Sequence, residues 1–550
     1  MYPKKDSAQL LISAVHQFDI DTVVISPGSR NAPLTVGFSN HPEIKALSIV
    51  DERCAAFFAL GIAQQTKKPV AIVCTSGSAL LNYYPAIAEA YYSNIPLVVI
   101  SADRPKELIG IGNGQTIKQE NVFANHILFS ANLEEGNKVK NLELVVEALQ
   151  IATNQKGPVH INIPFEEPLY ETVEELKKIN FSDVILSGSK EPQVNYNKLA
   201  SIWNSTAKKL ILVGVDHPDK KLQEIIAKYA QDPSVIVLTE TTSNLPGENY
   251  INSIDKVIFS LNEEQFKRFH PEVLMTLGGM VVSKKIKQLL RTCQPMHHWH
   301  IDEFKSMDTY HCLSEFIQVE PMQFLQKFGV ETIQIESKYQ QNWLDLKNRK
   351  SAKHQQYLEE IPHSDLKSFE LILSSMPNDS QLQLGNSSVI RYSQLYDLNN
   401  TLEVFCNRGT SGIDGCTSTA IGAAFASNKQ TVFITGDLSF FYDSNALWNN
   451  YIPKNFRILL INNSGGGIFR FIPGPKSTNA LDYFVTPHKM TAEQLSKMYD
   501  FEYRSASDTN GLQNSLTSFY AASEQPKILE VFTDKDVNDK VLKEYFNFIK

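Results

Sequence analysis

The sequence predicts an α/β protein of three domains, each built on a parallel sheet flanked by helices. Short apolar runs alternate with helical patterns along the chain, which is typical of parallel sheets. A length of 550 residues exceeds what one hydrophobic core usually organises. Two polar stretches interrupt the pattern at residues 170–192 and 336–363, and both read as connectors. We therefore expect domains at residues 1–180, 190–335 and 360–550.

The composition narrows the classes of function. Hydrophobic residues make up 42% of the chain and charged residues 20%, an ordinary globular mixture. No apolar run has the length that a bilayer requires, and Met1–Asp6 does not begin a signal peptide, so a cytoplasmic protein without a membrane partner is expected. A net charge of −8 without a basic tract argues against nucleic acid as a partner. The six cysteines show no Cys-x-x-Cys spacing and are expected as free thiols.

The first domain carries chemically capable residues where its predicted strands end. A helix at 7–17 precedes strands at 22–26, 46–50, 70–75 and 97–101. Arg30 follows the first strand, Glu52 the second and Arg104 the fourth, while the third ends in the small-residue turn 75–78. An acid at a helix start is also an ordinary dipole partner, and Arg104 could simply pair with Asp103, so structural roles stay open.

The central domain is predicted to be a second α/β unit, with strands at 210–215, 235–239 and 273–277. It lacks the Gly-x-Gly-x-x-Gly pattern, which argues against a dinucleotide-binding dehydrogenase. Lys284 stands at a predicted helix start, where its charge opposes the helix dipole; this conflict favours function over a solvated helix end. The cluster 297–300 contains three histidines, but neighbours on a strand point to opposite faces, which disfavours a metal site.

The third domain holds the most informative stretch. A strand at 432–435 ends in Gly436-Asp437-Leu438-Ser439, a helical segment is predicted through Trp448, and a strand at 458–461 ends in Asn462-Asn463-Ser464-Gly465. Parallel strands carry their ligands at their carboxyl ends, so Asp437 and Asn463 are expected to meet. One carboxylate, one amide oxygen and a backbone carbonyl suit Mg²⁺ and a diphosphate. Two unrelated strand-end turns are the alternative.

The Gly-Asp-x-Ser turn followed by Asn-Asn-x-Gly resembles the thiamin-diphosphate motif of the decarboxylase and acetolactate-synthase superfamily. Several further blocks resemble, in the same order, the MenD family of 2-succinyl-5-enolpyruvyl-6-hydroxy-3-cyclohexene-1-carboxylate synthases. They are residues 26–33 (SPGSRNAP), 51–57 (DERCAAF), 75–79 (TSGSA), 101–105 (SADRP), 385–391 (GNSSVIR), 406–415 (CNRGTSGIDG) and 465–469 (GGGIF). Thr410 departs from the alanine expected in the family.

The resemblance implies a pyrimidine-binding (PYR-type) first domain, a central α/β domain that needs no flavin, and a diphosphate- and metal-binding (PP-type) third domain. It implies that Glu52 hydrogen-bonds the aminopyrimidine N1′ and that Ile413 holds the cofactor bent. The implied cofactor-binding residues are Ser29, Glu52, Ser78, Asn386, Ser387, Ser411, Ile413, Asp437, Leu438, Ser439, Asn463 and Ile468, and the implied metal ligands are Asp437, Asn463 and Gly465.

The resemblance also implies thiamin-diphosphate- and Mg²⁺- or Mn²⁺-dependent decarboxylation of 2-oxoglutarate and conjugate addition to isochorismate, in a homodimer or dimer of dimers with active sites between subunits. The residues implied to act on the substrates are Glu52, Arg30, Arg104, Gln115, Lys284, Arg391, Arg408, Ile468 and Phe469. Another thiamin-diphosphate-dependent 2-oxo acid decarboxylase or carboligase would keep Glu52, Asp437 and Asn463 but not the arginine set. A catalytically silent regulatory or binding homologue would be expected to have lost Glu52 or the metal ligands, and neither is lost in this sequence.

Overall fold

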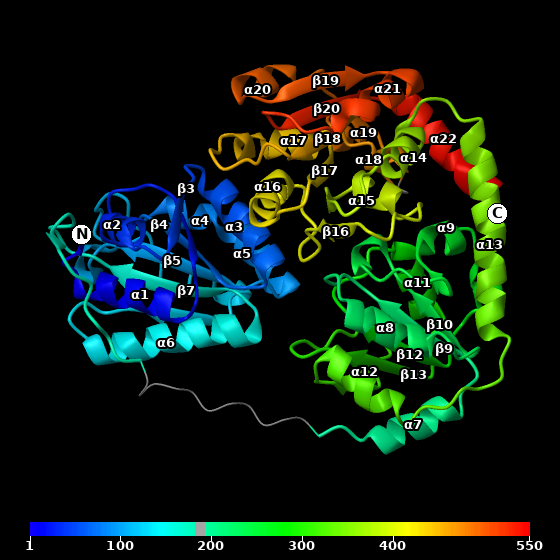
Figure 1. Ribbon diagram of the computed structural model, residues 1–550, viewed down its shortest axis with the longest axis horizontal. Helices are drawn as coiled ribbons and strands as arrows, with labels where there is room; N and C mark the ends of the chain where they lie inside the picture. The colour runs from blue at the N-terminus through cyan, green and yellow to red at the C-terminus, as the bar shows by residue number, and fades with distance from the viewer. Residues whose placement is uncertain (182–192, 472–473) are drawn as a thin grey trace. The chain divides into compact units, whose positions relative to one another are not determined.

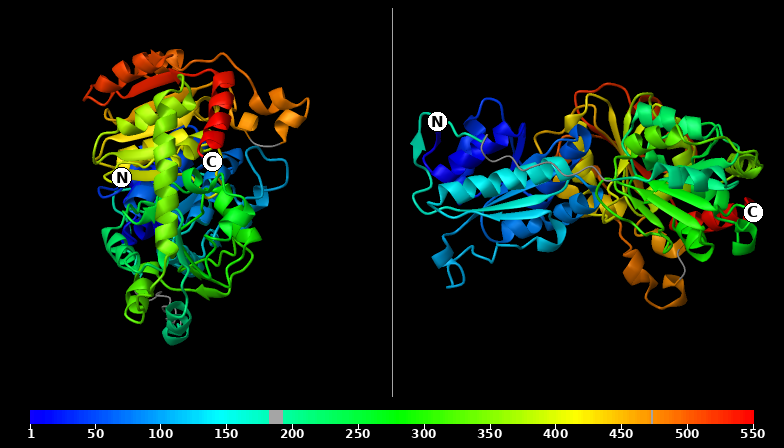
Figure 2. Two further views of the ribbon diagram at one scale, coloured as in Figure 1. Left: turned by 90° about the vertical axis from the view of Figure 1, so that its right-hand side faces the viewer. Right: turned by 90° about the horizontal axis from the view of Figure 1, so that it is seen from below.

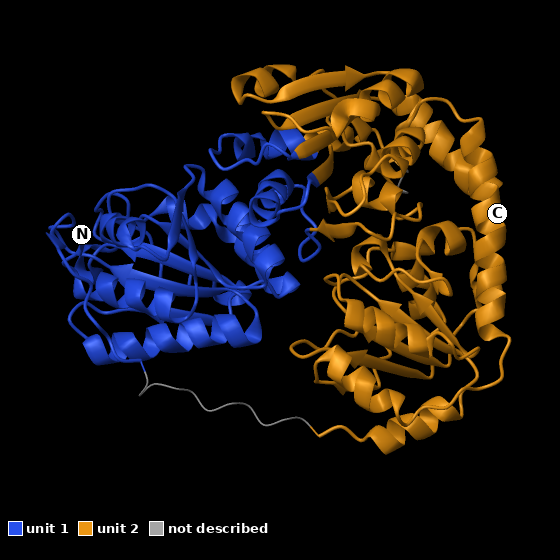
Figure 3. Ribbon diagram, in the orientation of Figure 1, with its two compact units in different colours: residues 1–189, 407–431, 439–456 blue, residues 190–406, 432–438, 457–550 orange. Residues whose placement is uncertain are grey.

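The computed structural model describes residues 1–181, 193–471 and 474–550 (Figure 1). It contains three six-stranded sheets flanked by helices, which confirms the predicted α/β class. The domain boundaries stay predictions, and residues 182–192 of the expected first connector lie outside the described part. The chain forms two compact units: unit 1 comprises Met1–Ser189, Asn407–Thr431 and Ser439–Phe456, and unit 2 comprises Lys190–Cys406, Val432–Leu438 and Arg457–Lys550 (Figure 3).

The first sheet lies in unit 1 and has the order β3-β2-β4-β5-β7-β6, with its pairs parallel. The predicted strands all form, with ends shifted by one or two residues. The elements are β1 Tyr2–Pro3, α1 Asp6–Gln17, β2 Thr22–Ile25, α2 Ala32–Asn40, β3 Lys45–Ser48, α3 Glu52–Thr66, β4 Val70–Cys74, α4 Ser78–Asn82, α5 Tyr84–Ser93, β5 Leu97–Asp103, β6 Phe129–Asn132, α6 Lys138–Gln155, β7 Val159–Pro164 and β8 Thr172–Val173.

Unit 1 also contains α16 Cys416–Ala426, which packs against α3 through small residues. A Cβ on Gly422 would lie 2.0 Å from the carbonyl oxygen of Phe58, and one on Gly61 would lie 2.1 Å from that of Thr419. The two backbones therefore approach more closely than any side chain at these positions allows. The helix that begins at Glu52 is thus held against a segment more than 350 residues later in the chain.

The central sheet belongs to unit 2 and has the order β11-β10-β9-β12-β13-β14, which is that of dinucleotide-binding folds. The segments that follow β9 and β12 approach each other closely, because a Cβ on Gly214 would lie 1.9 Å from the carbonyl oxygen of Gly279. The elements are α7 Tyr196–Asn204, β9 Lys209–Val213, α8 Lys220–Tyr229, β10 Val235–Leu238, β11 Tyr250–Ile251, α9 Ile254–Ile258, α10 Glu263–Phe266, β12 Val273–Leu277, α11 Lys284–Thr292, β13 His297–Ile301, β14 Glu315–Ile317 and α12 Pro321–Gly329.

Two of the clustered histidines on β13 bond the same hydroxyl. His298 Nε2 and His300 Nδ1 each lie 2.9 Å from Thr276 Oγ1 on the neighbouring strand β12. Both side chains are buried, and burial lowers the pKa of His298 to about 4. These neutral imidazoles therefore serve the packing of the central sheet.

The third sheet has the order β16-β15-β17-β18-β20-β19 and repeats the topology of the first sheet strand for strand. Its elements are α14 Asp365–Ser374, β15 Gln381–Leu384, α15 Ser388–Ser393, β16 Glu403–Cys406, β17 Thr431–Gly436, α17 Asp437–Tyr442, β18 Arg457–Asn462, α18 Ile468–Phe471, α19 Leu481–Val485, α20 Glu493–Met498, β19 Glu502–Ala506, α21 Thr509–Phe519, β20 Lys527–Phe532 and α22 Lys535–Phe548. The prediction that one helix reaches Trp448 was wrong. Helix α17 ends at Tyr442, and a separate 3-10 turn follows at Ser444–Leu447.

Helix α13, Tyr339–Glu359, joins the central and third sheets within unit 2 (Figure 2). It forms where the polar second connector was predicted. Its Lys350 is 2% exposed and donates both to Ser260 Oγ at 2.7 Å and to the carbonyl oxygen of Ile549 near the chain end. This one ammonium group therefore links the central domain to the last helix. None of the described helices has the length and apolar character needed to cross a membrane.

Candidate active site

Three neighbouring strands of the third sheet end in residues predicted to bind the cofactor. β15, β17 and β18 are adjacent, and β17 and β18 pair in parallel. Asn386 and Ser387 follow β15, Asp437 follows β17 and Asn463 follows β18. The sheet thus brings Asp437 and Asn463 to the same edge, as their spacing predicted.

Asp437 is 3% exposed, and several polar groups surround its carboxylate. Its carboxylate accepts hydrogen bonds from the backbone amides of Leu438 at 2.6 Å and Gly465 at 2.9 Å. His488 Nε2 lies 3.3 Å from the same carboxylate, a neighbour that the sequence had not indicated. Burial raises the pKa of Asp437 to about 6. A carboxylate that is costly to leave charged and unpaired is a good ligand for a cation.

Asn463 has one satisfied and one unsatisfied end. Its Nδ2 donates to Asp365 Oδ2 at 2.9 Å, while its Oδ1 is buried without a hydrogen-bond partner. An orphaned amide oxygen beside a buried carboxylate fits Mg²⁺, which takes oxygen ligands. The described residues contain no cluster of three or more His, Cys, Asp or Glu side chains suited to a metal. A cation here would therefore use amide and backbone oxygens besides Asp437.

Glu52 begins helix α3 in unit 1. Asp51 is the N-cap and accepts from the backbone amide of Cys54 at 3.1 Å, so the cap is provided by the preceding acid and not by Glu52. Burial raises the pKa of Glu52, and a hydrogen bond with Asn82 partly opposes that shift. A half-buried carboxyl group with a raised pKa is suited to exchanging a proton with a bound ligand.

Arg30 is held at the edge of the first sheet. Its guanidinium group donates to the carbonyl oxygen of Phe165 at 2.9 Å and pairs with Glu167 at 3.0 Å. Burial lowers the pKa of Arg30, and the positive charge of Arg104 nearby acts in the same direction. Two cations at one sheet edge are suited to an anion. The turn before Arg30 needs its glycine, since a Cβ on Gly28 would lie 2.3 Å from Thr75 Cβ.

The loop from Arg408 to Ile413 is fixed by a buried acid that sequence reasoning missed. Glu89 of α5 is 1% exposed and accepts from the backbone amides of Gly409 at 2.6 Å and Thr410 at 2.7 Å. Thr410 Oγ1 adds a third hydrogen bond at 2.8 Å, which gives the departure from alanine a structural role. Ser439 Oγ donates to the carbonyl oxygen of Ile413 at 2.7 Å.

Lys284 is exposed at the start of α11, where the sequence predicted a helix. Ser283 is the N-cap and accepts from the backbone amide of Ile286 at 3.2 Å. Glu240, also missed by sequence reasoning, accepts from the backbone amides of Val282 at 2.6 Å and Ser283 at 2.7 Å. A buried carboxylate therefore holds the turn from which Lys284 projects.

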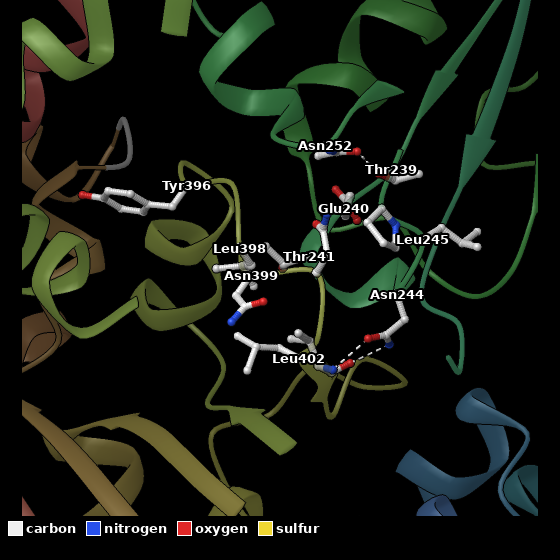
Figure 4. Close-up of a pocket in the computed structure, with 13 residues that line it drawn as sticks. Thr239, Glu240, Thr241, Asn244, Leu245, Asn252, Tyr396, Leu398, Asn399 and Leu402 are labelled. Carbon is white, nitrogen blue, oxygen red and sulfur yellow. Dashed lines mark hydrogen bonds between the residues drawn. The ribbon is translucent and has the colours of Figure 1, made fainter. Parts of the chain in front are cut away.

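Figure 4 shows Glu240 at a junction between the central and third domains. Asn244 completes this junction by donating to the carbonyl oxygen of Val404 at 2.8 Å and accepting from its amide at 2.7 Å. A cavity at this junction measures about 60 Å³. A second cavity, of about 390 Å³, lies beside Trp203. No predicted site residue lines either cavity, so we do not assign the catalytic site to them.

The remaining predicted residues divide between the units. Gln115 is exposed in unit 1 with φ of 56°, and its carbonyl oxygen accepts from Ser76 Oγ at 2.9 Å. Ser29, Ser78, Arg104, Arg408, Ser411 and Ser439 also belong to unit 1. Unit 2 contains Lys284, Asn386, Ser387, Arg391, Asp437, Leu438, Asn463, Gly465, Ile468 and Phe469.

Comparison with known proteins decides the family. Residues 5–126 match the family model described as "Thiamine pyrophosphate enzyme, N-terminal TPP binding domain". A protein of Flavobacterium johnsoniae named 2-succinyl-5-enolpyruvyl-6-hydroxy-3-cyclohexene-1-carboxylate synthase is 53% identical over 99% of both chains. Proteins of the same name from Flavobacterium psychrophilum and Bacteroides thetaiotaomicron are 54% and 38% identical, over 99% and 100% of both chains. The chain belongs to the 2-succinyl-5-enolpyruvyl-6-hydroxy-3-cyclohexene-1-carboxylate synthase family.

Membership of this synthase family makes the chain a thiamin-diphosphate-dependent enzyme and confirms the resemblance seen in its motifs. The matched N-terminal model spans Arg30, Glu52, Ser78, Arg104 and Gln115. Asp437 and Asn463 lie outside it, in the part of the chain that only the full-length relatives cover.

Proposed function

We propose that this enzyme decarboxylates 2-oxoglutarate and adds the resulting four-carbon unit to isochorismate, releasing CO₂ and forming the product after which its relatives are named. The observation that carries the proposal is the full-length similarity to those synthases together with the presence of Glu52, Asp437 and Asn463 in the motifs of this chain. The alternative is another thiamin-diphosphate-dependent 2-oxo acid decarboxylase or carboligase, which would share these three residues.

When bound, thiamin diphosphate supplies the nucleophilic carbon that attacks a keto group and the electron sink that allows CO₂ to leave. Asp437, Asn463 and the backbone of Gly465 would hold Mg²⁺ or Mn²⁺, and the metal would hold the diphosphate. Asn386, Ser387 and Leu438 would bind the same end from their strand ends. Glu52 would exchange a proton with the aminopyrimidine N1′, for which its raised pKa is suited.

The basic residues are proposed to recognise the substrates by charge. 2-Oxoglutarate and isochorismate are both dicarboxylates, and a hydrogen bond to a charged group contributes about 1.5–3 kcal/mol. The proposed carboxylate ligands are Arg30, Arg104, Lys284, Arg391 and Arg408. Gln115 is proposed to contact substrate, Ile468 and Phe469 to wall the pocket, and Ser29, Ser78, Ser411, Ile413 and Ser439 to contact the cofactor.

We further propose that the enzyme works in the cytoplasm as a homodimer or dimer of dimers, with Glu52 of one subunit facing Asp437 of another. Large apolar side chains exposed on unit 1 support an assembly, among them Tyr442 and Trp448, each 54% exposed. Sedimentation equilibrium at micromolar concentration tests it. A monomer that retains full activity would refute the shared site.

The experiment that tests the function identifies the product by mass spectrometry. Purified enzyme with thiamin diphosphate and Mg²⁺ is given 2-oxoglutarate or pyruvate as donor, each with isochorismate. Only 2-oxoglutarate should yield an adduct whose mass equals that of both substrates less CO₂. Adduct formation from pyruvate at a similar rate would favour the alternative carboligase, because pyruvate lacks the second carboxylate.

A further inference from the structure

The metal-site amide of Asn463 has two ends of similar shape and opposite chemistry. Its oxygen can coordinate a cation, whereas its NH₂ group cannot. An asparagine that is free to turn over would present either end. The orientation of this amide therefore decides whether a metal can be bound. A hydrogen-bond partner of Asn463 must fix that orientation.

Asp365 is the neighbour that Asn463 contacts through its nitrogen. Its Oδ2 accepts from Asn463 Nδ2 at 2.9 Å, and its Oδ1 accepts from Thr533 Oγ1 at 2.6 Å. Asp365 is 1% exposed, so water does not compete for these bonds. An ionised carboxylate only accepts hydrogen bonds, so turning the amide over would set oxygen against oxygen.

An ordinary structural role does not account for Asp365. It is the first residue of α14, where an acid can serve as a dipole partner or cap. The cap is already provided by Ser364, whose side chain accepts from the backbone amide of Lys367 at 3.3 Å. The carboxylate of Asp365 points instead to Asn463 and Thr533, which follow β18 and β20.

We propose that Asp365 is a positioning residue for the metal site: it holds the Asn463 amide so that Oδ1, and not Nδ2, is presented to the divalent cation. The buried Oδ1 that has no partner in the protein is the observation that carries this inference. The inference rests on the proposed role of Asn463 as a metal ligand. Asp365 itself does not touch the metal.

The test measures Mg²⁺ affinity by calorimetry on the full-length protein with saturating thiamin diphosphate. Loss of a residue that orients a metal ligand typically weakens metal binding about 10–100-fold. We expect Asp365→Asn to fall in this range, because its amide can also rotate and no longer dictates the orientation of Asn463. Ser364→Ala, which removes the cap of the same helix, should leave the Mg²⁺ affinity unchanged.

Exchanging the two side chains separates orientation from stability. In the double variant Asp365→Asn/Asn463→Asp, the amide at 365 donates to one carboxylate oxygen at 463 and leaves the other for the cation. It should bind Mg²⁺ more tightly than either single variant, even if those variants fold poorly. A merely structural role for Asp365 predicts no such rescue.

Two results would overturn the positioning role of Asp365 itself, and a third would overturn the ligand set on which that role rests. If Asp365→Asn binds Mg²⁺ like the unaltered enzyme while Asn463→Ala does not, the metal role of Asn463 stands and the positioning role of Asp365 fails. A double variant no better than its single parents would overturn the positioning role as well. If Asn463→Ala itself binds Mg²⁺ normally, the proposed ligand set fails first.

Discussion

Glu89 and Thr410 are joined by two hydrogen bonds, one from the amide of Thr410 and one from its hydroxyl, across 321 positions of sequence. The same carboxylate accepts from the amide of Gly409. Arg408 directly precedes Gly409 and Thr410 in the chain, and Ser411 follows them. A single buried acid in α5 thus sets the path of a loop that carries three proposed site residues, Arg408, Ser411 and Ile413.

Replacing Glu89 should therefore loosen this loop. In Glu89→Gln one end of the side chain becomes a donor facing other donors, and an unsatisfied buried group costs about 1–3 kcal/mol. We expect a lower melting temperature and weaker thiamin diphosphate binding, measured by thermal unfolding and calorimetry. Glu143→Gln on the exposed side of α6 is the matched control. Equal behaviour of the two variants would contradict a role for Glu89.

Glu240 should act through Lys284. Because Glu240 holds the two amides that precede Lys284, Glu240→Gln is expected to raise the KM for 2-oxoglutarate about 10-fold, the loss of about 1.4 kcal/mol. In a Lys284→Ala background the same change should add little, since the group that it positions is gone. The exposed Glu248→Gln is the control. Additive effects of Glu240→Gln and Lys284→Ala would show that Glu240 acts elsewhere.

The close packing of α3 on α16 should not tolerate a methyl group. Gly422→Ala would place a Cβ 2.0 Å from the carbonyl oxygen of Phe58, so the helices must separate. Overpacking typically costs about 1–3 kcal/mol. Gly114→Ala provides the control, because its Cβ would meet nothing within 4 Å. Thermal unfolding that is equally unaffected in both variants would contradict the packing.

Asp443 should make the stability depend on pH. It is fully buried, accepts from the backbone amide of Ser418 at 2.8 Å, and burial raises its pKa to about 6. The folded state therefore binds this proton more tightly than the unfolded chain, whose carboxyl pKa is about 3.9. The tighter proton binding stabilises the folded state by at most about 3 kcal/mol. This stabilisation is complete below pH 3.9 and is lost as the pH rises through 6.

The variant Asp443→Asn lacks this titratable carboxyl group. Its melting temperature minus that of the unaltered enzyme should become more positive as the pH rises from 5 to 7.5. The exposed Asp345→Asn should give a difference that does not change with pH. A constant difference for Asp443→Asn would contradict the raised pKa.

Local patterns predicted the sheets because buried parallel strands are short apolar runs between turns. The strand predicted at Val273–Leu277 has those bounds in the structure. The helix predicted through Trp448 failed because Asp443 turns into the interior to meet Ser418, a tertiary contact that ends the regular helix at Tyr442.

In the candidate site, too, local sequence patterns predicted some residues, whereas residues set by tertiary contacts were missed. Asp437, Asn463 and Glu52 could be proposed as site residues from the sequence, because each stands near a predicted strand end, where parallel sheets bind ligands. Glu89, Glu240 and Asp365 could not, since each bonds residues that are 320, 43 and 98 positions away in the sequence. The one available signal was a lone acid within the apolar pattern of α5, at Glu89.

The most direct test of the proposed function is anaerobic CO₂ release from 2-oxoglutarate by the enzyme with thiamin diphosphate and Mg²⁺. It is measured with and without isochorismate, beside Glu52→Gln. We expect sustained release only with isochorismate, and its loss in Glu52→Gln, which keeps the shape of the side chain but cannot exchange the proton. Steady release without isochorismate, or full activity of Glu52→Gln, would contradict the proposed reaction or the role of Glu52.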